Sequence, residues 1–286
     1  MTKTIVVTGC DAAHYDLVTD LLTSLRDVHG TGVTIGYIHV GNDIVPPAIA
    51  ALVDHIVDVP VASIPGRQRD GYLLAGLGIK PHVPEFFPGF DIYVWLDGDT
   101  WVQNPTGVEQ LIHCAQLADI CLHPEADPNY FDRRIPDPHS ARVYMSLYGR
   151  SETEKNLPYT MLNAGVFAAR AQSPMWGRWK QALAEITGRW ADGGQPFFSD
   201  QIPLHRLAAT GQVSVYPLRA VNNWLVYHST PSVNLQRKRL LAPTFPYEEI
   251  NIIHLVASAK NATFRLGDSG REITFRYRDI KALFGG

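Results

Sequence analysis

The chain has few cysteines and no long apolar run. Only three of its 286 residues are cysteines (Cys10, Cys114 and Cys121), and their spacing is unlike that of a metal site. They are expected to be reduced thiols in the core of a cytoplasmic protein. No apolar stretch approaches the length that crosses a bilayer, and the first residues lead directly into an expected strand. Neither a membrane span nor a signal peptide is therefore expected.

An excess of charge of either sign is also missing. The 25 Lys and Arg residues against 28 Asp and Glu residues give a formal net charge of -3, which argues against a dedicated nucleic-acid binder. The C-terminal region is mildly basic, so peripheral contact with anionic lipid at the inner face of the membrane stays open. An ordinary solvated surface is the favoured interpretation, because these charges form no dense block.

Strands and helices alternate through the first part of the chain, which favours an α/β fold with a mostly parallel sheet. Strands are expected at 4–8, 33–40, 55–59, 92–96, 119–123, 164–169, 213–216 and 252–256. Helices are expected at 15–29, 46–53, 106–117, 173–190 and 200–209. Residues 124–158 are expected to form a long loop region with one helix around 141–148. No repeat or linker divides the chain, so residues 1–286 are expected to form a single domain.

Two carboxylates follow a strongly apolar segment. Five apolar residues, Ile92 to Leu96, predict a buried central strand, and Asp97 and Asp99 come directly after it with Gly98 between them. Open α/β sheets bind ligands at the carboxyl ends of their strands. Two carboxylates so close together repel each other unless a cation lies between them, and oxygen ligands suit Mg²⁺ or Mn²⁺. The segment predicts a divalent metal site that holds a nucleotide diphosphate.

A second polar strand end lies near the C-terminus. His254 ends another apolar segment, and Lys260 follows six residues later. A lone histidine at a strand end is usually structural, but beside Asp97 and Asp99 it would complete a metal site with open positions for phosphate oxygens. Lys260 would then neutralise charge on a departing diphosphate.

The loop after the first strand is a candidate nucleotide site, because it lies at the head of a helix. Thr8 and Asp11 could bind a base or a ribose, and Tyr15 could stack on the base. The alternative interpretation is a helix cap at Asp11 and a packing tyrosine at 15.

Two further polar pairs begin later elements. Asn163 and Ala164 open an apolar strand before Gly165, where glycine permits close backbone approach, although a simple turn is the alternative. Asp200 and Gln201 begin a helix, where an aspartate is most often an N-cap; the functional interpretation is a carboxylate and an amide that line a sugar pocket.

The order of these motifs resembles a known family. The chain carries Trp-Leu-Asp-Gly-Asp-Thr at 95–100, Leu-Asn-Ala-Gly-Val-Phe at 162–167, Ser-Asp-Gln at 199–201 and His-x-x-Ala-x-x-Lys at 254–260. It resembles the GT-A-fold glycosyltransferases, in particular the group of glycogenin and the bacterial lipopolysaccharide galactosyl- and glucosyltransferases (family 8). The resemblance covers nearly the whole chain. The chain departs from the family's pattern in the spacing of the first loop, at Ala257 in place of glycine, and at Asn261 in place of proline.

The resemblance implies a GT-A fold, with a central, mostly parallel sheet flanked by helices, and a metal-dependent retaining transferase. Such an enzyme would move a hexose from UDP-glucose or UDP-galactose to a hydroxyl acceptor on a glycan, a lipid-linked sugar or a small molecule. The implied nucleotide-binding half is 1–123 and the acceptor-side half is 124–286. The implied ligands of Mn²⁺ (or Mg²⁺) are Asp97, Asp99 and His254, and the implied catalytic residues are Asp200 and Gln201. The implied donor contacts are Thr8, Asp11, Tyr15, Lys80, Asp97, Asn163, Ala164 and Lys260.

The same residues allow three other interpretations. A phosphatase or phosphotransferase of the haloacid-dehalogenase type would use Asp97 as a nucleophile, but that family normally carries its motif on the first strand. A non-catalytic sugar-binding module is disfavoured because Asp97, Asp99, His254 and Lys260 are all intact. A sugar-nucleotide pyrophosphorylase would need a glycine-rich N-terminal loop with an arginine, which residues 9–13 do not supply.

Overall fold

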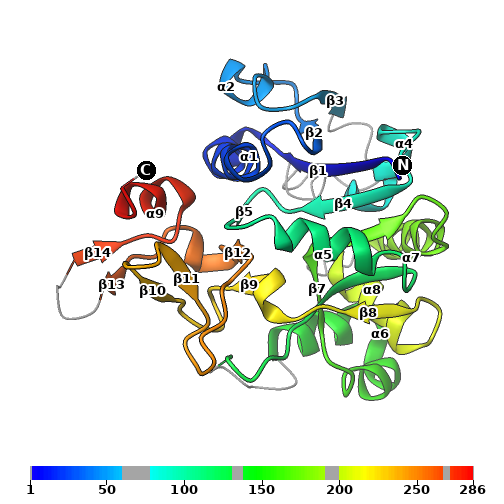
Figure 1. Cartoon of the computed structure of the whole chain (residues 1–286). Helices are drawn as coiled ribbons and strands as arrows, with labels where there is room; N and C mark the ends of the chain where they lie inside the picture. Colours follow the sequence, from blue (N-terminus) through cyan, green and yellow to red (C-terminus); the bar gives the residue numbers. More distant parts are fainter. Residues whose placement is uncertain (1, 60–77, 131–137, 191–199, 267–270, 286) are drawn as a thin grey trace.

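A seven-stranded sheet forms the centre of the computed structural model, which describes residues 2–59, 78–130, 138–190, 200–266 and 271–285 (Figure 1). The strand order is β3-β2-β1-β4-β7-β6-β8, and β7 is antiparallel to both neighbours while the other pairs are parallel. The strands are β1 (Thr4–Cys10), β2 (Thr34–Val40), β3 (His55–Val59), β4 (Ile92–Leu96), β6 (Ile120–Pro124), β7 (Leu162–Arg170) and β8 (Val215–Pro217). The predicted mostly parallel sheet is confirmed.

Helices cover both faces of this sheet. The helices of the described residues are α1 (Tyr15–His29), α2 (Pro47–Ala50), α4 (Val83–Phe86), α5 (Thr106–Cys114), α6 (Pro138–Asn156), α7 (Met175–Trp190), α8 (Gln201–Ala209) and α9 (Tyr277–Leu283), with 3-10 helices η1 (Ala12–His14), η3 (Lys80–His82), η4 (Ala220–Asn222) and η5 (Ala257–Lys260). Helix α9 packs against α1. Helix α1 ends at Gly30, whose φ of +56° suits glycine and whose N–H closes the last turn on the Arg26 carbonyl.

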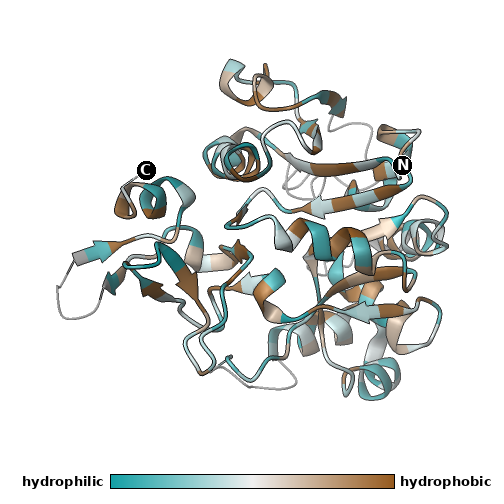
Figure 2. Cartoon of the chain, viewed as in Figure 1, coloured by the Kyte–Doolittle hydropathy of each residue, from teal (hydrophilic) through white to brown (hydrophobic). Residues whose placement is uncertain are grey.

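Successive side chains of the strands enter two separate apolar layers, as the two-residue period of a strand requires. On β4, Val94 packs with α1 and α5, whereas Trp95 packs with α6, α7 and α8. Figure 2 shows the hydrophobic residues concentrated on the strands and on the inner sides of the helices. Because both faces are covered, the carboxyl edge of the sheet is where its polar residues gather.

A second, smaller β region follows the central sheet in the C-terminal part of the chain. Its three-stranded sheet has the order β5-β12-β9, with β5 (Thr100–Val102), β12 (Ile252–His254) and β9 (Trp224–Leu225); the other strands are β10 (Ser232–Asn234), β11 (Arg239–Leu241), β13 (Phe264–Leu266) and β14 (Arg271–Ile273). β12 pairs antiparallel with β5, and His254 lies opposite Thr100. This pairing brings the late histidine beside the turn that carries Asp97 and Asp99.

Several expected details differ from the structure. Asp200 precedes α8 but makes no side-chain cap, because its carboxylate forms an ion pair with Lys80 instead. Helix α6 is longer than expected and contains a non-helical residue, Gly149, at φ +75°. Strands from both predicted halves share the central sheet. The division into a nucleotide-binding half and an acceptor-side half stays a prediction. Within the described residues, no helix is both long and apolar enough to cross a membrane.

Candidate functional site

The turn between β4 and β5 is held by its own backbone. The Asp97 N–H donates to the Gly165 carbonyl on β7 (2.7 Å), and the Thr100 N–H and hydroxyl both donate to the Asp97 carbonyl (2.9 and 2.8 Å). These bonds end β4 sharply and place the Asp97 and Asp99 side chains on the same side of a tight turn.

The three predicted metal ligands lie together. One ligand atom each from Asp97, Asp99 and His254 lies within 4.8 Å of the others. The backbone opposite them is glycine, since a Cβ at Gly165 would lie 2.2 Å from His254 Cε1 and 2.8 Å from Asp97 Oδ2. Two carboxylates and one imidazole are a donor set that suits Mn²⁺ or Mg²⁺, so these residues fit a divalent cation.

A lysine lies on each side of this group. Lys80 is buried at 3% exposure, and its Nζ lies 2.9 Å from Asp97 Oδ1 and 2.7 Å from Asp200 Oδ2. Burial alone would lower the pKa of Lys80, but the charges of Asp200 and Asp97 outweigh it and raise the pKa above the usual range. Lys260 Nζ lies 3.0 Å from Asp99 Oδ2.

The start of β7 connects these groups to the start of α8. The Ala164 carbonyl accepts a hydrogen bond from Lys80 Nζ (3.1 Å), and the Ala164 N–H donates to Gln201 Oε1 (3.4 Å). Asp200 and Gln201 therefore lie across from Ala164, and Asp200 is joined to Asp97 through Lys80. Their predicted role beside the donor sugar requires such a position. That role stays a prediction.

Sequence reasoning did not single out Glu125, which the structure places among these residues. Its Oε1 accepts hydrogen bonds from Asn163 Nδ2 (2.9 Å) and Gln201 Nε2 (3.1 Å), and its Oε2 lies 3.9 Å from His228 Nε2. Burial raises the pKa of Glu125, but the nearby His228 imidazole and the hydrogen bonds from the Asn163 and Gln201 amides outweigh burial and lower it. The signal was present, because Glu125 follows the apolar strand β6, which runs in the same direction as β4.

In the loop after β1, the side chain of Asp11 is already engaged by neighbouring residues. Asp11 accepts from the Ala13 N–H (3.0 Å) and pairs with His14 Nδ1 (2.9 Å), so it caps η1 as the alternative interpretation suggested; the pair with His14 lowers the pKa of Asp11. The Thr8 hydroxyl is buried, without a hydrogen-bond partner within the described ranges. Donor contacts by Thr8 and Asp11 stay predictions.

Tyr15 is tied to the sheet through a buried histidine. Its hydroxyl lies 2.8 Å from His39 Nε2, and His39 Nδ1 lies 3.0 Å from Asp58 Oδ1. The Tyr15 ring stacks on the His39 ring. A role for Tyr15 in stacking on a base stays a prediction.

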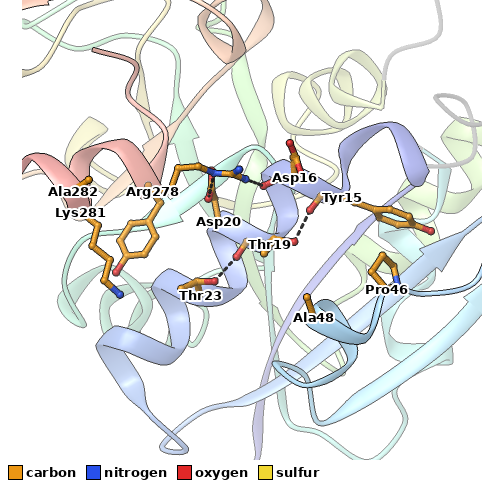
Figure 3. A pocket seen from close by; sticks show the side chains of 11 residues that line it. Tyr15, Asp16, Thr19, Asp20, Thr23, Pro46, Ala48, Arg278, Lys281 and Ala282 are labelled. Atoms are coloured by element: carbon orange, nitrogen blue, oxygen red, sulfur yellow. Dashed lines mark hydrogen bonds and ion pairs between the residues drawn. The ribbon is translucent and has the colours of Figure 1, made fainter. Parts of the chain in front are cut away.

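A groove opens on the outer side of Tyr15 (Figure 3). Its walls come from α1, α9 and the start of α2, and its lining residues are Tyr15, Asp16, Thr19, Asp20, Thr23, Pro46, Ala48, Tyr277, Arg278, Lys281 and Ala282. Asp20 accepts hydrogen bonds from Arg276 Nε and Arg278 Nε (3.0 and 2.9 Å). This lining contains none of Asp97, Asp99 and His254, so the groove is separate from the candidate metal site.

Comparison with solved structures identifies the fold. The crystal structure of the galactosyltransferase LgtC, in complex with donor and acceptor sugar analogs, matches 98% of this chain and 95% of its own with a TM-score of 0.60. The chain has the GT-A fold. The sequence identity is 15%, so the match establishes the fold, as the sequence resemblance predicted. No family model matches the sequence, and no curated protein matches it.

Proposed function

We propose that this protein is a metal-dependent glycosyltransferase that moves a hexose from UDP-glucose or UDP-galactose to a hydroxyl acceptor with retention of configuration. The observation that carries the proposal is the group of Asp97, Asp99 and His254 at the carboxyl edge of the sheet. The LgtC structure, which has the same fold, holds donor and acceptor sugar analogs.

In this proposal Asp97, Asp99 and His254 hold Mn²⁺ or Mg²⁺. When bound, the cation stabilises negative charge on the diphosphate as it leaves. Lys260 adds a second positive charge at the same place, since it lies 3.0 Å from Asp99. Lys80 fixes Asp97 and Asp200 in one geometry through its two ion pairs.

The sugar and acceptor lie beside Asp200, Gln201 and Glu125 in this proposal. Asp200 and Gln201 orient the donor hexose, and one of them faces the anomeric carbon opposite the leaving group. Glu125 accepts a hydrogen bond from the Gln201 amide (3.1 Å), and its lowered pKa keeps it ionised. It therefore places a carboxylate on the acceptor side. Thr8, Asp11 and Tyr15 contact the base and ribose. A cytoplasmic location, with at most peripheral membrane contact, belongs to the same proposal.

A phosphatase of the haloacid-dehalogenase type is less well supported. An aspartate nucleophile needs an oxygen that is free to attack phosphorus. Both oxygens of Asp97 are instead engaged: Oδ1 accepts a hydrogen bond from Trp95 Nε1 (2.7 Å) and pairs with Lys80 (2.9 Å), and Oδ2 accepts from the same Lys80 Nζ (3.3 Å). The motif also follows β4, the fourth strand of the chain, whereas the phosphatase family normally carries it on the first strand.

Titration calorimetry with UDP and GDP, each with and without Mn²⁺, tests the proposed function. Binding of UDP that requires Mn²⁺ is expected for the native protein, and Asp99→Asn should lose the metal-dependent part. Glu109→Gln, which removes an exposed carboxylate on α5, is the matched control and should bind as the native protein does. Absence of nucleotide binding under every condition would reject the nucleotide-sugar proposal, and binding that is indifferent to Mn²⁺ would reject the metal role.

A further inference from the structure

A continuous chain of buried side-chain hydrogen bonds joins Glu125 to the histidine of the metal-ligand group. Glu125 Oε1 accepts from Asn163 Nδ2 (2.9 Å), and Asn163 Oδ1 accepts from Asn223 Nδ2 (2.9 Å). Asn223 Oδ1 lies 2.9 Å from His254 Nδ1, and His254 Nε2 lies 3.2 Å from Asp99 Oδ1. Asn223 is completely buried, and Asn163 and His254 are nearly so.

The direction of these bonds is fixed at one end. An ionised carboxylate only accepts hydrogen bonds, so Asn163 must present its Nδ2 to Glu125. The Gly165 N–H only donates, and it donates to Asn163 Oδ1 at 3.0 Å. Two unambiguous partners, one acceptor and one donor, therefore set the same orientation of the Asn163 amide.

That orientation determines the proton position on His254. Because Asn163 presents Oδ1 to Asn223, Asn223 must present its Nδ2 there and its Oδ1 to the histidine. An amide oxygen only accepts, so His254 Nδ1 must carry a proton and donate it. The nitrogen left facing Asp99 is Nε2.

On the basis of the proposed function, we infer that Asn223 and Asn163 are positioning residues for the metal ligand. They hold the proton on His254 Nδ1, so that the Nε2 lone pair is the one offered to the cation. Polar partners of this kind fix the tautomer and the ring orientation of metal-bound histidines. Asn163 then acts from inside the protein, since both of its Oδ1 hydrogen bonds are to Gly165 and Asn223 rather than to a donor.

The backbone of β7 leaves room for the His254 ring, and the hydrogen bond with Asn223 favours one orientation of it. The absent Cβ of Gly165 leaves room for His254 Cε1, which would lie 2.2 Å from it. A ring flipped by half a turn would place Cδ2 against Asn223 Oδ1 and Cε1 toward the Asp99 side. It would exchange a hydrogen bond for a carbon contact in a buried place, which is unfavourable.

Nitrogen-15 NMR on the metal-free native protein tests the proton position directly. Histidine labelling gives signals from 11 residues, and His254→Gln identifies the His254 signal by its loss. A protonated Nδ1 on His254 is expected, both without metal and with diamagnetic Mg²⁺. A His254 that carries its only proton on Nε2 would overturn the inference. This NMR measurement needs neither a variant at position 223 nor enzymatic activity.

A pair of adjacent asparagines provides the matched variants. Asn222 is equally buried, and its amide bonds Gln110 (2.7 Å) and Asn251 (2.7 Å) outside this chain of hydrogen bonds. In Asn223→Leu the affinity for Mn²⁺ alone, read from the paramagnetic resonance of free Mn²⁺, should fall about 10–100-fold. Asn222→Leu should stay within about twofold of the native protein, and should keep the Nδ1 proton signal that Asn223→Leu loses.

The outcomes separate this inference from the proposed function. Unchanged Mn²⁺ affinity in Asn223→Leu, or an equal loss in Asn222→Leu, would overturn the positioning role while leaving the metal site intact. A native protein that binds no Mn²⁺ would instead remove the metal-dependent function, and with it the ligand role of His254. The NMR result would then report only on the orientation of the ring.

Discussion

At the scale of single residues, the packing of Asp97 and His254 depends on a residue without a side chain. Gly165→Ala places a Cβ 2.2 Å from His254 Cε1 and 2.8 Å from Asp97 Oδ2, closer than atoms can pack. Because both neighbours are proposed metal ligands, we expect Mn²⁺-dependent nucleotide binding to fall at least about tenfold and stability to fall by about 1–3 kcal/mol. Calorimetry and urea unfolding measure the two effects.

Gly177→Ala is the matched control for that substitution. Gly177 lies in α7, and a Cβ there would meet no atom within 4 Å. Alanine is the better helix residue by about 0.5–1 kcal/mol, so this variant should be more stable and bind nucleotide normally. If Gly165→Ala behaved like Gly177→Ala, the close packing of β7 against the ligands would be wrong.

The residues that the sequence could predict are those that end long apolar segments. Asp97 and Asp99 follow five buried residues of β4, and the open-sheet rule places them at the ligand-binding edge. Glu125 obeys the same rule, but its strand ends in His123-Pro124 inside a polar, proline-bearing region that obscures the pattern. Asn223 has no local signal at all, since its proposed positioning role depends on contacts with residues 60 and 31 positions away.

At the scale of elements, length and apolar pattern decided what was predictable. The bounds of α1 and β4 follow from their sequences, because a helix stripe marks α1 and an uninterrupted apolar segment marks β4. Strands β5 and β9 have three and two residues, too few for any periodicity. The start of α5 is also set by residues before the helix, because Asn104 Oδ1 accepts from the Thr106 N–H (3.1 Å) and Pro105 takes the N-cap position.

The short helix η5, which carries Lys260, begins with a strained residue. Ala257 has a φ of +53°, in the left-handed region where glycine is favoured and where the resembling family carries glycine. Ala257→Gly removes the contact between Cβ and the following carbonyl, so we expect a gain of about 1 kcal/mol in the free energy of unfolding. Urea unfolding measures it.

Substituting another alanine of the same element separates relief of strain from a general effect of glycine. Ala259 is buried within η5, and Ala259→Gly should lose about 0.5–1 kcal/mol because glycine gains more chain entropy on unfolding. A loss of stability in both variants would contradict the strain at Ala257. A gain at 257 alone would show that this chain tolerates alanine at a position shaped for glycine.

At the scale of the whole molecule, the last helix closes the fold onto the first. Tyr277 and Lys281 of α9 both bond Asp27 on α1, and Arg278 donates to the Asp16 carbonyl (2.8 Å). These contacts join residues about 250 positions apart in sequence, and they form one wall of the groove in Figure 3. No periodicity could predict them, since they depend on how the small β region returns the chain to α1.

Asp20 is the residue on which this closure depends most. It is 6% exposed, and it accepts hydrogen bonds from Arg276 (3.0 Å) and Arg278 (2.9 Å). In Asp20→Asn the largely buried Arg276 loses its counter-charge, whereas the half-exposed Arg278 regains water. Removing one partner of a buried ion pair costs about 3–5 kcal/mol, and solvent at Arg278 places the expected loss near the lower value.

Asp16→Asn, on the same helix, is the control for Asp20→Asn. Its side chain is exposed and only its main-chain carbonyl contacts Arg278, so the loss should stay within about 0.5 kcal/mol. Urea unfolding gives both values, and amide hydrogen exchange should show faster opening of α9 in Asp20→Asn alone. Equal stability of the two variants would mean that α9 is held by its apolar contacts, with Ile280 in the core, and that the ion pairs only set its orientation.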